Sequence, residues 1–270
     1  MLFKSKIDPE LIMTTNDLSN IANKLSILAN ENLTLLEGRC QDTIEIQDYY
    51  IGILRKQALL LSDLSLILQN RNSENISTPF ILLRSLLDDF LHLLYLETHN
   101  DRKTEITKIN AEAFKYNFNS LIDLTNSNYK HFSGKYPFYM TNEQLQAIKN
   151  KFKAKEINKK YLKNPAEFKF KAFKSFGDMV KSISHSREVD IFKDRAYFLW
   201  KHFSSFVHYS NSSFEYELQD AKENMNMIDE SFQYCYNSIY LSFKYFEREL
   251  KIEFKDNTDF RKEYGIILEC

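Results

Sequence analysis

Six residues with the chemistry of an active site or an anion site lie in two helical stretches that are otherwise hydrophobic. They are Arg84 and Asp88 in FILLRSLLDDFLHLLYL, and Arg195, His202, Ser204 and His208 in RAYFLWKHFSSFVHYS. A charge or an imidazole on a hydrophobic helix face must be paired or used, because burying it alone costs several kcal/mol. An imidazole can transfer protons near neutral pH, and a guanidinium can bind phosphate or carboxylate. The two stretches therefore indicate a functional site more clearly than they indicate a reaction.

Arg84 and Asp88 share one stripe of their helix at about 100° per residue, so they can form an i,i+4 ion pair. The neighbouring leucines make this helix hydrophobic almost all round, and we expect the pair to be partly buried. Two interpretations remain open. The pair is either an internal contact that sets the helix register, or a guanidinium held by a carboxylate so that it faces an anion.

The later stretch carries its polar residues on two faces. Ser204 lies four residues before His208, close enough to bond its ring and select one tautomer. Arg195 and His202 share another face, about 120° away from His208 on an ideal helix. All of them belong to one small site only if the helix breaks or a second subunit contributes. A histidine at the edge of a helix face can equally be structural.

Metal and cofactor chemistry have less support. Asp89-x-x-His92 places a carboxylate and an imidazole on one helix turn, but a di-iron bundle needs Glu-x-x-His on two helices. The chain contains no GxGxxG, no GxxxxGK and no serine-hydrolase elbow. We expect neither a metal site nor a bound cofactor.

Composition predicts an all-α fold. The 270 residues include only 5 Gly and 4 Pro, with 43% hydrophobic and 27% charged residues. Turns are therefore scarce, whereas long helices need little of either residue. The 22 Phe and 16 Tyr predict helix interfaces filled by rings. We predict one helical-bundle domain over 1–270, with N-terminal helices in 14–125, a lysine-rich insertion at 126–189 and C-terminal helices in 190–270.

Hydrophobic periodicity predicts where the helices lie. The predicted helices cover about 16–37, 42–70, 78–97, 103–124, 190–208 and 227–254. Thr15 or Asn16 would cap the first helix, and Thr78 would cap the third. Thr141 and Gln144 form a capping box for a further, lysine-rich helix. Residues 126–140 are expected to form a loop, and residues 166–189 to be irregular or helical.

Ten lysines fall between residues 149 and 174 against only Glu156 and Glu167, so the rest of the chain is acidic although the net charge is −1. Phe and Tyr residues alternate with these lysines, and such a segment could follow a phosphate backbone and stack on bases. The alternative is a solvated surface whose rings face the core. The predicted nucleic-acid-binding residues are Lys151, Lys153, Lys155, Lys159, Lys160, Lys169, Lys171 and Lys174.

Cysteine usage and hydropathy predict a cytoplasmic protein. Cys40, Cys235 and Cys270 have neither metal-ligand nor CxxC spacing, and an odd number suits reduced thiols. The N-terminal residues lack a hydrophobic signal region, and no run reaches the roughly 18 apolar residues of a membrane span. We expect no membrane partner.

The two motifs resemble a large group of uncharacterised bacterial all-helical proteins, a domain-of-unknown-function family. Its hallmarks are an Arg followed four residues later by an acid, and a Ser-x-x-x-His in a later helix. In this sequence they correspond to Arg84 with Asp88, where Glu is usual, and to Ser204 with His208. The resemblance covers about residues 45–250 and is specific at these two motifs.

That group in turn resembles the HEPN superfamily, whose active members are dimeric, metal-independent ribonucleases of toxin–antitoxin and anti-phage systems. Those nucleases carry Arg-x(4–6)-His, and Arg195-x6-His202 fits the outer limit of the spacing. Ala196 stands where those proteins commonly have a polar residue. The resemblance implies an RNA-cleaving or RNA-associated defence effector that forms homo-oligomers. Its implied partners are RNA and a cognate antitoxin or another defence-system protein.

Three classes of function remain open. In an RNA-cleaving effector, His208 or His202 would move protons while Arg84 or Arg195 stabilises the phosphorane charge. In a non-enzymatic bundle, Arg84 and His208 would bind an anionic ligand. In a scaffold or antitoxin-like partner, the same residues would serve stability and a dimer interface. Convergence of Arg84 and His208 on one solvent-reachable cavity would favour the first two classes.

Overall fold

The computed structural model describes residues 13–40, 45–70, 77–184, 186–207 and 221–265. Within these ranges the regular secondary structure is helical apart from one short hairpin, which confirms the predicted all-α fold. Contacts divide the chain into two compact units, one formed by residues 1–98 with 179–270 and the other by residues 99–178. The lysine-rich insertion predicted at 126–189 overlaps the second unit, which also includes the whole of α4 (Arg102–Phe132).

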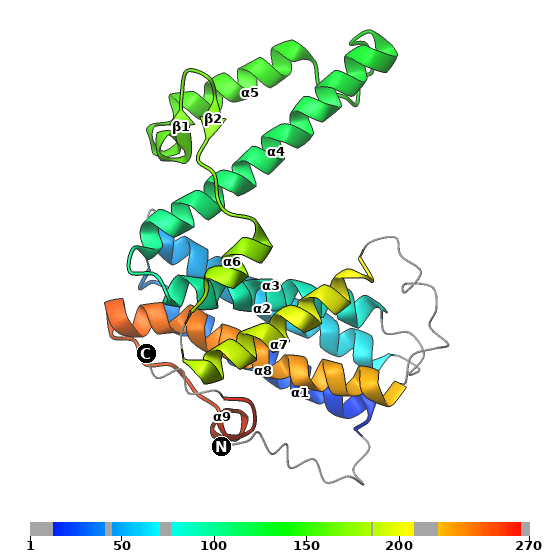
Figure 1. Cartoon of the computed structure of the whole chain (residues 1–270), viewed down its shortest axis with the longest axis vertical. Coiled ribbons are helices and arrows are strands. Elements are labelled where there is room, and N and C mark those ends of the chain that lie inside the picture. The colour runs from blue at the N-terminus through cyan, green and yellow to red at the C-terminus, as the bar shows by residue number, and fades with distance from the viewer. Residues whose placement is uncertain (1–12, 41–44, 71–76, 185, 208–220, 266–270) are drawn as a thin grey trace. The chain divides into compact units, whose positions relative to one another are not determined.

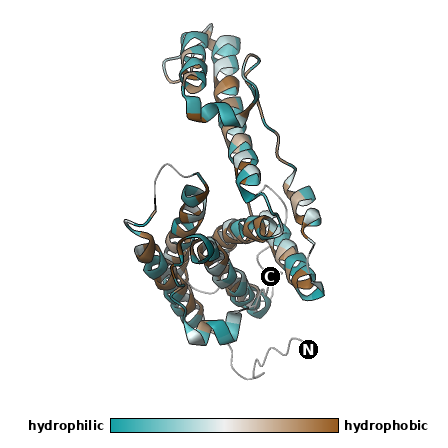
Figure 2. Cartoon of the chain, turned by 90° about the vertical axis from the view of Figure 1, so that its left-hand side faces the viewer, coloured by the Kyte–Doolittle hydropathy of each residue, from teal (hydrophilic) through white to brown (hydrophobic). Residues whose placement is uncertain are grey.

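The first unit is a helical bundle with α3 at its centre (Figure 1). Its helices are α1 (Thr15–Leu36), α2 (Glu45–Gln69), α3 (Ser77–Glu97), α7 (Arg187–Ser204), α8 (Ala221–Leu250) and α9 (Thr258–Tyr264). α1 packs against α2, while α3 contacts α2, α7 and α8. Phe80, Leu87 and Phe90 of α3 are fully buried, as expected for a helix that is hydrophobic almost all round. Hydrophobic and hydrophilic residues share the same helices (Figure 2), so their apolar sides can pack inward. None of the described helices combines the length and the hydropathy needed to cross a membrane.

Helix starts follow capping chemistry, with small shifts from the predicted positions. Thr14 caps α1 and forms a capping box, one residue before the first of the predicted caps. α3 already includes Ser77, so Thr78 lies inside the helix rather than at its N-cap. The capping box predicted at Thr141 and Gln144 is confirmed. Neighbouring Ser and Thr residues cap equally well, so residue type alone does not select between them.

Three C-terminal helix ends differ from the prediction by four residues or more. The first is α8, which ends at Leu250 rather than at residue 254. α7 ends at Ser204 rather than at residue 208, because the next three backbone N–H groups donate to carbonyl oxygens three positions back. His208 lies outside the described residues. α4 continues to Phe132, so the loop predicted from residue 126 begins later. The polar residues near the end of α4 are satisfied locally, since the Thr125 hydroxyl donates to the Leu121 carbonyl oxygen at 2.8 Å.

The second unit has its own aromatic core. It contains α4, α5 (Asn142–Ala154), the 3-10 helix η1 (Glu156–Tyr161), β1 (Leu162–Asn164), β2 (Lys169–Phe170) and the start of α6 (Phe176–Ser182). β1 and β2 pair antiparallel, so part of the segment expected to be irregular or helical is a strand. Two strands alone are marginally stable, but these carry rings that pack on α4. The packed rings are Phe114, Phe118, Phe152, Tyr161, Phe168 and Phe170.

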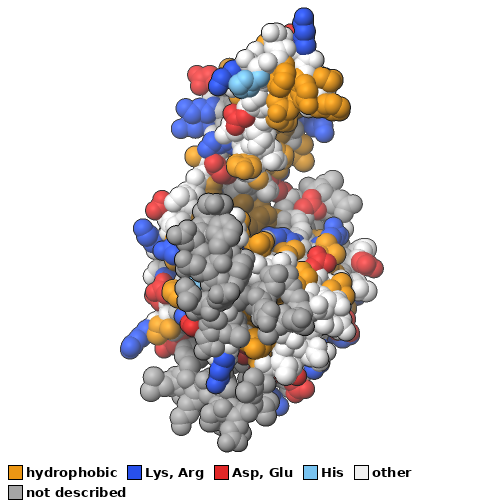
Figure 3. Space-filling model, turned by 90° about the vertical axis from the view of Figure 1, so that its right-hand side faces the viewer, with side chains coloured by type: hydrophobic (Ala, Val, Ile, Leu, Met, Phe, Trp, Pro, Cys, Tyr) orange, Lys and Arg blue, Asp and Glu red, His pale blue; other side chains and the backbone are white. Residues whose placement is uncertain are grey.

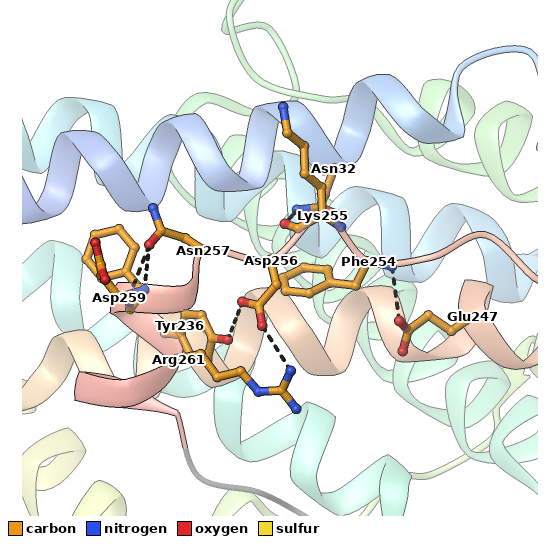
Figure 4. A network of polar contacts seen from close by, with 10 residues as sticks. Asn32, Tyr236, Glu247, Phe254, Lys255, Asp256, Asn257, Asp259 and Arg261 are labelled. Atoms are coloured by element: carbon orange, nitrogen blue, oxygen red, sulfur yellow. Dashed lines mark hydrogen bonds and ion pairs between the residues drawn. The ribbon is translucent and has the colours of Figure 1, made fainter.

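Within the first unit, polar contacts hold the segment after α8 against α1 and α8 (Figure 4). The buried Asn32 amide of α1 donates to the Lys255 carbonyl oxygen at 3.0 Å and accepts from the Lys255 N–H at 2.9 Å. The Tyr236 hydroxyl of α8 donates to Asp256 at 2.7 Å. These bonds satisfy a buried amide and hold the chain against α1 and α8.

Asp229 of α8 makes the packing of α9 dependent on pH. It accepts a hydrogen bond from the Tyr264 hydroxyl at 3.1 Å. Burial raises the pKa of Asp229 to about 6, and the nearby Glu263 and Glu230 act in the same direction. The folded state therefore binds this proton more tightly than the unfolded state, whose pKa is about 3.9. The stabilisation from the protonated form is present at low pH and is lost as the pH rises through 6.

We expect Asp229→Asn to raise the free energy of unfolding by roughly 2 kcal/mol at pH 7.5, because an amide still accepts from Tyr264 without a buried charge. The gain should vanish below about pH 4, where the carboxyl group is protonated in both states. Urea unfolding at both pH values measures it. The exposed Asp63, on α2, supplies the control Asp63→Asn, which should show no such gain. An equal effect of Asp229→Asn at the two pH values would contradict the expectation.

Candidate functional site

Arg84 of α3 is held in a defined direction by two residues of α7. Its Nε donates to the Ser204 hydroxyl oxygen at 3.1 Å, and its guanidinium carbon lies 5.0 Å from the centre of the Trp200 ring. The Ser204 hydroxyl donates in turn to the Trp200 carbonyl oxygen at 2.7 Å. A guanidinium that lies over an indole gains a cation–π attraction. Arg84 is half-buried, so its orientation is constrained while part of the side chain reaches solvent.

Asp88 does not form the predicted ion pair with Arg84. Its Oδ1 instead accepts from the Trp200 indole N–H at 3.1 Å, and no ion pair joins Arg84 to a carboxylate within the described part of the chain. The indole thus uses its face for the guanidinium and its N–H for the carboxylate. Helix periodicity places two residues on one stripe, but it does not show which side chain of the facing helix each will contact.

His92 continues the network one turn further along α3. Its Nδ1 lies 2.8 Å from the Asp88 carbonyl oxygen and 3.8 Å from the Asp88 Oδ2. Because a carbonyl oxygen can only accept, the ring donates from Nδ1 in this contact. The predicted site residues did not include His92 or Trp200. The i,i+4 spacing of His92 from Asp88 is a signal that could have found the histidine.

Asp89 belongs to a separate buried contact between α3 and α2. Lys56 donates to its Oδ1 at 2.8 Å, and the Gln57 amide donates to its Oδ2 at 3.1 Å. Burial raises the pKa of Asp89, and the Lys56 ammonium partly offsets this effect. Both carboxylate oxygens are thus bonded to α2. In the part of the chain that the structure describes, no group of three or more His, Cys, Asp or Glu side chains could hold a metal ion.

The terminal nitrogens of Arg84 are the chemically available part of this network. Within the described residues, no acceptor is bonded to either of them. A guanidinium whose terminal nitrogens have no bonded acceptor presents two parallel N–H donors, which match two oxygens of a phosphate or a carboxylate. The Ser204 hydroxyl, by contrast, already donates to Trp200 and accepts from Arg84. Ser204 is therefore a positioning residue rather than a nucleophile in this arrangement.

Arg195 lies on the side of α7 that faces α8, apart from the Arg84 network. Its Nε and one terminal nitrogen donate to the two carboxylate oxygens of Glu230, each at 2.7 Å. The guanidinium carbon also lies 4.9 Å from the centre of the Phe198 ring. This bidentate pair neutralises Arg195 with a carboxylate of the same chain.

His202 lies among aromatic rings. The ring centres of Phe80, Phe198, Phe203 and Phe206 are 5.6–6.5 Å from its own. Its Nε2 is buried, with no hydrogen-bond partner in the described structure. Burial lowers the pKa of His202, so the ring is neutral at neutral pH. The structure therefore does not bring Arg195 and His202 to the Arg84 network.

Four of the rings that alternate with the predicted lysines, Phe152, Tyr161, Phe168 and Phe170, pack in the core of the second unit, so they are not free to stack on bases. Lys153 lies over the Phe168 ring at 6.0 Å, and Lys160 lies over the Tyr161 ring at 5.1 Å. Apart from the half-buried Lys171, the remaining predicted lysines are exposed, namely Lys151, Lys155, Lys159, Lys169 and Lys174. Their role in binding nucleic acid stays a prediction.

The fold and this network define an all-helical protein in which a Trp and a Ser of one helix orient an Arg of the central helix. A family model described as a family of unknown function (DUF5677) matches residues 47–226, about two thirds of the chain. The chain belongs to this family, which confirms the predicted domain of unknown function. The matched residues include Arg84, Asp88, Trp200 and Ser204. No curated protein and no solved structure matches the chain.

Proposed function

We propose that this protein is an RNA-associated effector and that Arg84, at the α3–α7 contact, binds a phosphate group of the RNA. The orientation of Arg84 carries the proposal, because Trp200 and Ser204 hold the guanidinium while its terminal nitrogens stay available. A phosphodiester offers two oxygens that suit such paired donors. The identity of the ligand as RNA, the defence role, the homo-oligomer and the antitoxin or defence-system partner come from the resemblance to HEPN proteins.

A second candidate is a non-enzymatic protein that uses the same site for an anionic ligand. Arg195 and His202, the two residues with the spacing of HEPN nucleases, favour this second candidate. Arg195 is bound to Glu230, and His202 is enclosed by rings. Both candidates share the anion contact at Arg84. They differ in the ligand, because the first candidate binds RNA, with or without cutting it, whereas the second binds another anion.

Arg84→Gln is expected to weaken binding of a short single-stranded RNA by about 10- to 100-fold, since hydrogen bonds to charged groups contribute roughly 1.5–3 kcal/mol. Arg84→Lys should recover only part of the affinity, because an ammonium cannot present the paired donors. Fluorescence anisotropy with a labelled RNA measures the affinity. The control is Arg187→Gln, which removes an exposed arginine at the other end of α7. Equal affinities of Arg84→Gln and Arg187→Gln would refute the Arg84 contact.

Incubation of the same proteins with mixed RNAs in the presence of a chelator separates the two candidates. An RNA-cleaving effector should cut without metal, and Arg84→Gln should abolish the cut. His208→Ala tests the predicted proton carrier in the same assay. Cleavage that depends on Arg195 or His202 but not on Arg84 would show that the active site lies on the side of α7 that faces α8. Binding of RNA without cleavage at any protein concentration would leave an RNA-associated effector that is not a nuclease, and no binding of RNA would favour the second candidate.

A further inference from the structure

The end of α4 and the turn after it carry an exposed aromatic surface that the Arg84 site does not use. We call it the tip patch, and it consists of the exposed Tyr129, Phe132, Tyr136 and Phe138 with the half-buried Tyr139. Phe138 is 83% exposed, and Tyr129 and Phe132 are 41% and 43% exposed. Figure 3 shows hydrophobic side chains gathered at the upper end of the molecule, with basic side chains and a histidine nearby. Single exposed rings are normal on a protein surface, but several large rings gathered at one turn are typical of a binding surface.

The backbone that presents the tip patch is held by Asn128. This side chain is fully buried, and its amide donates to the Met140 carbonyl oxygen at 3.2 Å while its Oδ1 accepts from the Tyr136 N–H at 3.0 Å. Gly134 takes the positive φ of 77° that the turn after the helix requires. Phe132 stacks on Tyr136 with ring centres 4.6 Å apart. The rings are thus presented by an ordered turn, which lowers the entropy lost when a ligand binds.

The charge around the tip patch is positive. Residues 126–140 contain Lys130, His131 and Lys135, all exposed, and no Asp or Glu. The whole second unit, 99–178, contains sixteen Lys and Arg residues against eight Asp and Glu residues, a formal charge of +8. The other unit therefore carries −9, since the chain carries −1. A polyanion is attracted to the second unit and repelled by the first.

We propose that the tip patch stacks on bases of a single-stranded RNA while Lys130 and Lys135 contact its phosphates. The choice of RNA rests on the proposed function. Exposed ring faces beside lysines are what sequence-tolerant binding of a single strand requires. A neutral apolar partner would use the rings but would gain nothing from the charge. The sequence pattern pointed to Phe152, Phe168 and Phe170 as stacking rings, whereas the structure exposes those of the tip patch instead.

Phe138→Ala in the full chain is expected to weaken the binding of a single-stranded RNA of about 12 nucleotides by about tenfold, the loss typical of one base–aromatic stack. Phe138→Leu should lose as much, because it keeps the apolar volume but has no ring face. Phe138→Trp should retain the affinity. The control is Tyr116→Ala, which removes a 73% exposed ring elsewhere on α4 and should change nothing. Fluorescence anisotropy measures each affinity.

Lys130→Gln and Lys135→Gln together test the phosphate contacts. The slope of log K against log salt should fall by about 0.7 for each lysine removed. An unchanged slope would overturn that part of the proposal.

Three results would overturn the stacking role. The first is unchanged RNA affinity in Phe138→Ala, and the second is full affinity in Phe138→Leu. The third is a loss in Phe138→Ala that is confined to binding of phosphatidylserine-containing vesicles, or to self-association measured by sedimentation. Arg84→Gln on the same RNA separates the two proposals. A loss of RNA affinity in Phe138→Ala alone would support the tip patch and refute the Arg84 contact. A loss of RNA affinity in Arg84→Gln alone would support the Arg84 contact and refute the tip patch.

Discussion

Glu97→Ala should lower the free energy of unfolding by about 2–4 kcal/mol, because it leaves two half-buried cations without their carboxylate. The Glu97 side chain, near the end of α3, is 3% exposed. Its two oxygens accept from Arg248 of α8 at 2.8 and 2.9 Å, and the Lys244 Nζ lies 3.6 Å away. The Lys244 Nζ and the Arg248 Nε have no hydrogen-bond partner of their own in the described structure. Removing Glu97 therefore removes the one carboxylate that pairs with both.

Chemical denaturation measures this loss, and matched variants separate its causes. Glu249→Ala removes an exposed carboxylate of α8 and should change stability by less than about 0.5 kcal/mol. Glu97→Leu combined with Arg248→Met should be more stable than Glu97→Leu alone, since an apolar pair costs less than an unpaired buried charge. A loss below about 1 kcal/mol in Glu97→Ala would mean that water reaches both cations once the carboxylate is gone.

Phe203→Ala should destabilise the first unit by about 3–5 kcal/mol and weaken RNA binding at Arg84 as well. Phe203 is fully buried in α7 and stacks on Phe80 of α3 with ring centres 4.5 Å apart. It immediately precedes Ser204, the residue that orients the Arg84 Nε. A cavity at this contact removes packing that sets the position of the last turn of α7 relative to α3.

Two variants on the same helix calibrate the effect of Phe203→Ala. Phe203→Leu should lose less stability, because it fills more of the cavity. Phe198→Ala, which removes a 52% exposed ring, should cost much less than Phe203→Ala. Urea unfolding measures stability, and anisotropy below the unfolding transition measures RNA affinity. Unchanged RNA affinity in a destabilised Phe203→Ala would show that the last turn of α7 does not position the Arg84 site.

Much of the fold could be predicted because the relevant signals are local. Scarce Gly and Pro and regular apolar spacing predicted the helices, and the leucines around Arg84 predicted that Arg84 and Asp88 would be partly buried, as both are. The capping box at Thr141 also depends only on residues within one turn. Arg84, Asp88 and Ser204 were chosen because they are polar residues on hydrophobic helices, and the structure places all three in one network.

The partner of each polar side chain depended on how distant helices pack. Arg84 bonds to Ser204, 120 residues away, rather than forming the predicted pair with Asp88, and Asp88 accepts from Trp200. Arg195 is bound to Glu230 because α8 faces that side of α7, which no pattern within α7 reveals. Likewise, the alternation of Lys and Phe in residues 149–174 does not show which of the rings are buried in the core of the second unit. Periodicity predicts which face of a helix a residue occupies, whereas the tertiary structure selects what lies opposite that face.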